Sequence, residues 1–316
     1  MLSKRIGRMA KMFNLLKAEL FKLRKRWMPY VLLLVLLSTV LLPVVINYIN
    51  YNDILSNNPE LANIEITVNP DGSTTISGLP PFEPDSRFDT TYMYAQQLAR
   101  LKKSLVLPGA MESVFDSIPN LGMFLVIVLA ASIIGNEYGW GTVRQAIGRG
   151  NSRASYLASK VLTSTITAVA GVIVVVAVGL IATIITSLLV EGSIAWEGFA
   201  SYFFISLGAS LLVIMVYIAL ATFFAVLLRS AMAGMAVAVA WFIGESIVMA
   251  LLIMSTGWLA DLNVYLLSYN TGQLLSFTLG GDFTTDMWKA VGLLVLYSGI
   301  FLAGSYGVFR RQDLTA

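Results

Sequence analysis

Six long apolar stretches constrain the fold of this chain more than any other feature of its sequence. They cover residues 28–49, 117–134, 161–189, 202–228, 233–254 and 287–309. The hydrocarbon layer of a bilayer is about 30 Å thick, so a helix needs about 20 mostly apolar residues to cross it. Only 12% of the residues are charged, whereas soluble domains carry about 25%. The sequence therefore predicts an all-α integral membrane protein with six transmembrane helices.

The placement of Lys and Arg predicts which ends of the spans face the cytoplasm. Most basic residues fall in 1–27, 135–160 and 310–316, whereas 50–116 and 255–286 hold few of them and most of the acids. Because positively charged loops stay in the cytoplasm, both termini and 135–160 are predicted to be cytoplasmic. The other two segments are predicted to be extracellular. The expected location is the plasma membrane of a bacterium.

The leader, residues 1–27, has the pattern of an amphipathic helix. Its apolar residues recur in steps of three and four and include Phe13, Leu16, Leu20, Leu23 and Trp27. Nine Lys and Arg residues surround this stripe, and Glu19 is the single acid. Such a helix lies in the plane of the membrane interface, with its stripe toward the acyl chains and its cations toward anionic headgroups. The alternative is an orientation signal that happens to be helical.

Residues 50–116 form the only sizeable segment outside the predicted spans. Ile64, Ile66 and Val68 alternate with polar residues, and an Asp71-Gly72 turn follows. This pattern is typical of a β-hairpin. Residues 88–105 have helical spacing. We therefore expect a small extracellular insertion, a hairpin followed by a helix, between the first and second spans.

The loop 135–160 predicts a short helix on the cytoplasmic face. Thr142 is placed to cap its start, and Gly148 or Gly150 to end it with a positive φ. Ser152 is placed to cap the next helix, which continues into the third span. A short, capped, basic helix suits docking into a groove on another protein. A solvated, positively charged loop is the alternative interpretation.

Several short motifs spread from the leader to the tail point to one family. In the loop they are Glu137-Tyr138-x-Trp140-Gly141-Thr142-x-Arg144, then Arg149-Gly150-x-Ser152-Arg153 and Lys160. Elsewhere they are Glu19-Leu20-x-Lys22-Leu23-Arg24, Leu107-Pro108-Gly109-Ala110 and Phe309-Arg310-Arg311-x-Asp313-Leu314. Together these residues resemble the ABC-2-type transporter permeases, and the resemblance covers the whole chain.

The resemblance implies a fold, partners and a function. It implies six membrane helices after an in-plane elbow helix, and pairing with a second permease subunit, either an identical copy or a close paralogue. It also implies a cytoplasmic ABC ATPase seated on a coupling helix between the second and third spans. The residues assigned to this coupling region are Glu137, Trp140, Gly141, Thr142, Val143, Arg144, Ala146, Ile147, Arg149 and Arg153. The expected function is the permease subunit of an ABC exporter, which forms the translocation path.

The sequence lacks the residues of a nucleotide site and of common catalytic centres. It contains no G-x-x-x-x-G-K-[ST] phosphate cradle, no Cys and no His. The chain is therefore not expected to be an enzyme or to bind a cofactor, and ATP with Mg²⁺ would belong to the partner. The acids Asp261, Asp282 and Asp286 are irregularly spaced, so no metal site is expected. The lipid membrane is an expected partner, and nucleic acid is not.

Glu245 lies deep in the fifth apolar stretch. Ionisable groups inside the membrane are costly and commonly mark functional sites. Contact with substrate, proton coupling and gating are the functional interpretations, and a hydrogen bond to Ser246 or to another helix is the structural one. Two alternative functions follow. One is a proton-coupled secondary transporter that uses Glu245, and the other is a non-transporting sensor or scaffold that binds a ligand through 50–116.

Overall fold

The computed structural model describes residues 2–69, 73–78, 90–191, 199–278 and 281–313. Asp71 and Gly72 of the predicted turn, Phe88 of the predicted helix and Leu314 of the C-terminal motif lie outside these ranges. The first half of the chain contains α1 (Leu2–Arg24), α2 (Trp27–Asn57), η1 (Pro59–Asn63), β1 (Glu65–Val68), β2 (Thr74–Ser77), α3 (Thr90–Leu105) and α4 (Ala110–Gly139). The second half contains α5 (Thr142–Gly148), α6 (Arg153–Val190), α7 (Phe199–Leu228), α8 (Ala231–Ile253), η2 (Gly257–Tyr265), α9 (Leu267–Leu275) and α10 (Thr285–Arg311).

Six of the described helices are long and apolar enough to cross a membrane, namely α2, α4, α6, α7, α8 and α10. They coincide with the six apolar stretches of the sequence, so the prediction of an all-α fold with six helices able to cross a membrane is confirmed. Most of them extend past the apolar stretch. Helix α6, for example, begins at Arg153, eight residues before its apolar part begins at 161. Polar residues can continue a helix beyond the hydrocarbon layer, so hydropathy alone places helix ends poorly.

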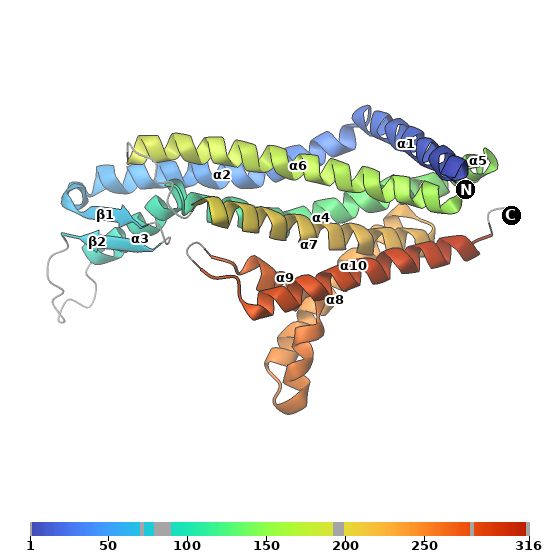
Figure 1. Cartoon of the computed structure of the whole chain (residues 1–316). Coiled ribbons are helices and arrows are strands. Elements are labelled where there is room, and N and C mark those ends of the chain that lie inside the picture. The colour runs from blue at the N-terminus through green and yellow to red at the C-terminus, as the bar shows by residue number, and fades with distance from the viewer. Residues whose placement is uncertain (1, 70–72, 79–89, 192–198, 279–280, 314–316) are drawn as a thin grey trace.

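One end of the bundle carries the hairpin, and the other carries α5 and both ends of the chain (Figure 1). Strands β1 and β2 pair antiparallel with Ile66 opposite Ile76, within the stretch where alternation predicts a hairpin. Helix α3 packs on the hairpin and on α2 around a small core that includes Ile54, Leu61 and Leu98. The insertion is therefore a separate apolar cluster fixed to the end of α2.

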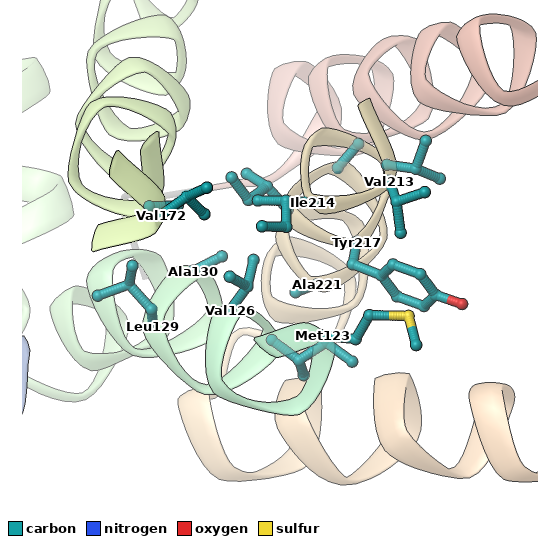
Figure 2. Close-up of a cluster of buried hydrophobic side chains, with 14 of the residues drawn as sticks. Met123, Val126, Leu129, Ala130, Val172, Val213, Ile214, Tyr217 and Ala221 are labelled. Atoms are coloured by element: carbon teal, nitrogen blue, oxygen red, sulfur yellow. The ribbon is translucent and has the colours of Figure 1, made fainter. Parts of the chain in front are cut away.

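The main core lies between α4, α6 and α7 (Figure 2). Its labelled side chains are Met123, Val126, Leu129 and Ala130 from α4, Val172 from α6, and Val213, Ile214, Tyr217 and Ala221 from α7. Ala130 and Ala221 are fully buried. Such small residues let helix backbones approach closely, which is how helices associate when lipid is as apolar as the core.

Helix α8 packs on the bundle over its first half, where Phe242 contacts Phe124 of α4 and Tyr217 of α7, and its end then leaves the bundle. A Cβ atom on Gly135 of α4 would lie 2.3 Å from the Cα of Ala231, so the two backbones are in direct contact there. Beyond its first half, the end of α8 and η2 project away from the other helices (Figure 1). Apolar side chains such as Ile247 and Leu251 are accordingly exposed. The face that α8 presents is apolar and uncovered by the rest of the described chain.

Candidate functional site

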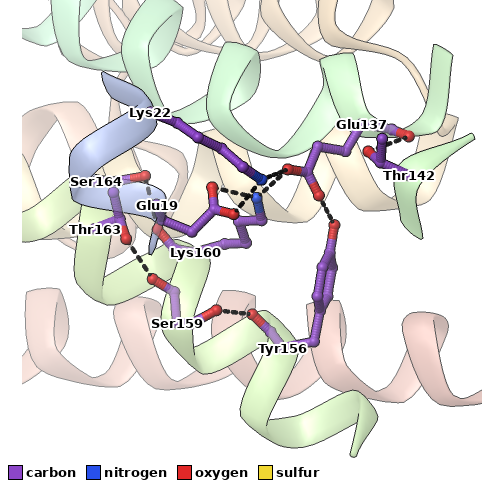
Figure 3. A network of polar contacts seen from close by, with 9 residues as sticks. All are labelled: Glu19, Lys22, Glu137, Thr142, Tyr156, Ser159, Lys160, Thr163 and Ser164. Carbon is purple, nitrogen blue, oxygen red and sulfur yellow. Dashed lines mark hydrogen bonds and ion pairs between the residues drawn. The ribbon is translucent and has the colours of Figure 1, made fainter. Parts of the chain in front are cut away.

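The residues of the predicted coupling region gather at the end of the bundle that holds α5 and both chain ends (Figure 1). At this end a buried ion cluster joins three helices. We define the cluster as Glu19 and Lys22 of α1, Glu137 of α4, and Tyr156 and Lys160 of α6 (Figure 3). The sequence motifs include Glu19, Lys22 and Lys160. They do not predict which residues these three side chains contact.

Lys160 is the centre of the cluster. Its side chain is only 1% exposed, and its Nζ lies 2.6 Å from Glu19 Oε2 and 2.5 Å from Glu137 Oε1. The Nζ of Lys22 bridges the same two carboxylates, at 2.8 Å and 3.4 Å. The hydroxyl of Tyr156 donates a hydrogen bond to the other oxygen of Glu137. Helix α1 is thereby tied to both α4 and α6.

The cluster contains two carboxylates and two ammonium groups, so its formal charge is balanced. Balance matters because an unpaired ion away from water is strongly unfavourable. Burial lowers the pKa of Lys22, but the hydrogen bond and charge of Glu19, with those of Glu137, outweigh it and raise the pKa above its usual value. A base whose pKa is raised in the folded state stabilises the fold fully at pH values below its ordinary pKa. This contribution is lost only as the pH rises through the raised pKa. Lys22 therefore holds α1 in place throughout the neutral range.

The local sequence of α6 supplies the cluster because its polar residues recur at helical spacing. Tyr156, Lys160 and Thr163 follow one another at steps of four and three, which places them on one face. The neighbouring hydroxyls are satisfied within the helix: Ser159 donates to the carbonyl of Tyr156 at 2.7 Å, and Ser164 to that of Lys160 at 3.0 Å (Figure 3). The Lys160 ammonium and the Tyr156 hydroxyl are thus left to bond with α1 and α4.

The predicted caps around α5 are partly correct. Ser152 caps α6 as predicted, its hydroxyl accepting from the Ser155 N–H at 3.1 Å. The prediction that Thr142 caps α5 is wrong. Gly141 occupies the cap position with φ +67°, so Thr142 lies inside the first turn and donates to the carbonyl of Glu137 at 3.4 Å. The left-handed backbone at the helix start favours glycine, and a side-chain pattern does not reveal it.

The side chains of α5 divide into an inward and an outward face. Val143 is 2% exposed, and Ala146 and Ile147 pack half-buried against the core of the same chain. The outward residues are Arg144, Gln145 and Arg149, which we call the α5 basic face. The apolar residues assigned to the coupling region thus point into the bundle, and its arginines point outward.

Trp140 and Gly141 are exposed just before α5. The guanidinium of Arg26 lies over the Trp140 ring, 4.8 Å from its centroid. This cation–π contact is a second link between the α1–α2 turn and the α4–α5 turn. The residues that precede α5 are therefore connected to the N-terminal part of the chain both through the buried ion cluster and at the surface.

Arg153 fastens the start of α6 to the end of α10. Its Nη1 lies within hydrogen-bond distance of three carbonyls, those of Phe309 at 2.9 Å, Arg310 at 2.7 Å and Gln312 at 2.8 Å, which share its two N–H donors. A cation is favourable there because the last carbonyls of a helix lack partners within it. Gln312, which the sequence did not single out, donates to the carbonyl of Val226 at 2.7 Å and accepts from Tyr138 at 2.9 Å. These bonds join α4, α6, α7 and α10.

The elbow residues do not share one environment. Leu16 and Leu23 are buried against the bundle and Leu20 is half-buried, whereas Phe13 is exposed. Trp27 is 85% exposed and belongs to α2, because α1 ends at Arg24. The buried face of α1 is therefore narrower than the predicted stripe.

Glu245 is bonded to a segment that the sequence did not predict as a helix. Its carboxylate accepts from the backbone N–H of Leu267 and from the hydroxyl of Ser268 at 3.3 Å, at the first turn of α9. A carboxylate is favourable at a helix N-terminus. Ser246 instead donates to the carbonyl of Phe242 at 2.9 Å. Of the two structural interpretations, a bond to Ser246 or to another helix, the structure shows the bond to another helix.

Replacing Glu245 with Ala is expected to destabilise the folded chain by about 1–2 kcal/mol, in the range measured for lost helix caps. Glu245→Gln keeps an acceptor oxygen and should cost less. Thermal unfolding of the purified chain in detergent measures both, and Asp282→Ala, an exposed acid in the segment that follows α9, serves as the control. Equal melting temperatures for Glu245→Ala and the control would show that the carboxylate does not hold α9.

No curated protein matches the chain. Residues 83–315 match the family described as protein of unknown function (DUF2705). The matched part runs from the segment before α3 to the C-terminal tail, so it includes α5, α6 and Glu245, while α1 and α2 precede it. Because the match covers well over half of the sequence, the chain belongs to the DUF2705 family.

Proposed function

We propose that the chain is the permease subunit of an ABC exporter in the plasma membrane of a bacterium, and that it is driven by a separate cytoplasmic ATPase. One observation carries the proposal. The α5 basic face is exposed, while the opposite face of α5 and both of its flanks are bonded to the bundle. A small exposed helix with a rigid attachment is what a docking element needs to pass a partner's movement into the membrane helices.

The bonds described above supply a route for that movement. Thr142 links α5 to Glu137, and Glu137 links α4 to α1 and α6 through Lys160. Arg153 links the far side of α5 to α10. When the ATPase subunits close on ATP and separate after hydrolysis, displacement of α5 would move these helices together. The permease would then alternate between inward-facing and outward-facing states.

The proposed arrangement in the membrane follows from the same features. Helix α1 lies in the cytoplasmic interface, both chain ends and α5 face the cytoplasm, and the hairpin with α3 lies outside the cell. The position of α5 with both chain ends at one end of the bundle, opposite the hairpin, supports this orientation (Figure 1). The proposed second permease subunit would pack on the far part of α8, which is the least buried of the six long helices that the structure describes.

The proposal predicts that an ATPase with a G-x-x-x-x-G-K-[ST] motif is encoded beside the gene of this chain, and co-expression of the two tests it. We expect the two to purify together and to carry a substrate into inverted vesicles only when ATP is supplied outside them. A Walker A Lys→Ala variant of the ATPase should remove transport without preventing copurification. If the chain alone drives flux in proteoliposomes from a proton gradient, without nucleotide, the proposal is overturned in favour of a secondary transporter.

A further inference from the structure

An apolar crevice lies between the α1–α2 turn and α6. Its volume is about 280 Å³. It adjoins a smaller cavity of about 60 Å³ between α2, α4 and α6, and the two share Pro29, Leu33, Thr167 and Gly171 in their walls. The two spaces therefore adjoin, and we call them together the recess, which runs from the end of α1 toward the core.

The wall of this recess favours an apolar occupant. The hydroxyl of Thr167, which lies in the part shared by the two spaces, already donates to the carbonyl of Thr163 at 2.8 Å. An internal water typically makes about three hydrogen bonds to polar partners, and the aliphatic wall offers few. Ile166 and Val174, on the outer wall, are exposed. The crevice thus opens where lipid chains surround a membrane protein.

The rim of the crevice carries a cation that is not engaged within the described part of the chain. Lys25 lies over the ring of Phe21, 4.7 Å from its centroid, and Arg26 lies over Trp140. Arg24 lines the crevice and its side chain is exposed. Its guanidinium makes no hydrogen bond or ion pair with a described residue. The hydroxyl of Tyr30 donates to the Arg24 carbonyl at 3.0 Å and fixes that backbone at the rim.

We propose that this crevice is a binding site for one anionic phospholipid, with an acyl chain in the recess and the headgroup phosphate on Arg24. A guanidinium binds phosphate in a bidentate manner, and basic sites between membrane helices bind anionic headgroups. The inference is independent of the proposed transport function.

Gly171 offers a way to fill the recess without disturbing the fold. A Cβ atom built on it meets no atom within 4 Å, and the residue lies in the wall of both spaces. Gly171→Phe therefore places a ring where the acyl chain would lie. The matched control is Gly292→Phe on the exposed side of α10, where a Cβ atom also meets nothing.

The test measures lipids bound to the delipidated full chain by native mass spectrometry, with phosphatidylglycerol and phosphatidylcholine of identical acyl chains. We expect one phosphatidylglycerol bound about fivefold more tightly than phosphatidylcholine, the effect of one cation near an anionic headgroup. Gly171→Phe should weaken binding of both lipids at least tenfold, and Gly292→Phe should not. Arg24→Gln should remove only the preference for phosphatidylglycerol, whereas Arg311→Gln, another exposed cation, should leave it. Inorganic phosphate should not compete.

Three results would overturn the site. The first is equal affinity for the two lipids in the unmodified chain. The second is equal loss of binding in the two glycine variants. The third is a shift of Gly171→Phe from dimer to monomer with lipid retention unchanged, which would assign the crevice to a second copy of the chain. Because Arg24→Gln alters only an exposed side chain, it remains informative if Gly171→Phe folds poorly.

Discussion

Replacing Lys160 with Met is expected to destabilise the folded chain by about 3–5 kcal/mol, the cost of breaking a buried ion pair by removing one partner. The two nearest carboxylates, Glu19 and Glu137, would remain buried with only the more distant Lys22 to compensate them. Loss of Lys160 should therefore also release α1 from α6. Thermal unfolding in detergent measures the first effect, and protease cleavage within residues 1–24 measures the second.

Two further variants separate the cluster from a general effect of losing a lysine. Lys289→Met removes a lysine from the pair with Asp286, whose side chains are 69% and 67% exposed, and should not change the melting temperature because exposed pairs contribute little. Adding Glu19→Gln and Glu137→Gln to Lys160→Met should restore much of the lost stability, since no uncompensated carboxylate remains. Equal melting temperatures for Lys160→Met and Lys289→Met would rule out a stabilising cluster.

Reversing both charges of the α5 basic face, with Arg144→Glu and Arg149→Glu, is expected to weaken ATPase binding on the order of 100-fold. Placing like charges across an interface costs several kcal/mol, and each 1.4 kcal/mol is a factor of ten. Because both side chains point outward, the variant should reach the membrane in normal amounts. Copurification of the ATPase and ATP-driven uptake into inverted vesicles, which reports export, measure the loss.

Two controls bear on the same prediction. Arg100→Glu reverses an exposed charge on α3, at the opposite end of the bundle, and should leave export unchanged. Val143→Glu places a charge in the core and should reduce the amount of folded protein, which distinguishes misfolding from uncoupling. Full export by the Arg144→Glu, Arg149→Glu variant would exclude α5 as the docking element.

The features that could be predicted from the sequence are those set by neighbouring residues. Apolar length gives six helices able to span a membrane, alternation around Ile66 gives the hairpin, and the spacing before α6 gives the Ser152 cap. Each depends on a period or a cap within a few positions. Helix α9 was missed because it is short and only moderately apolar, which is too little for a recognisable period.

The candidate site depends mainly on contacts between distant positions, which a single sequence does not show. Glu19 and Lys160 are 141 positions apart, and Arg153 and Gln312 are 159 apart. The direction of Val143 is also set by tertiary packing, since the periodicity of α5 defines an apolar face without saying what covers it. The same holds for Glu245, whose partner Leu267 follows 22 positions later.

The pairing of charges in the ion cluster has a consequence for the order in which the chain assembles. Glu19 and Lys22 lie one helical turn apart, and their charged atoms are 2.8 Å from each other, so α1 supplies a charge-balanced pair once its helix forms. The other pair, Glu137 and Lys160, is also neutral by itself. Each pair is charge-balanced before the other has formed. Helix α1 can bind Lys160 only once α6, the third long apolar helix, has been inserted. Seating of α1 would therefore report that the first half of the polypeptide has been inserted correctly.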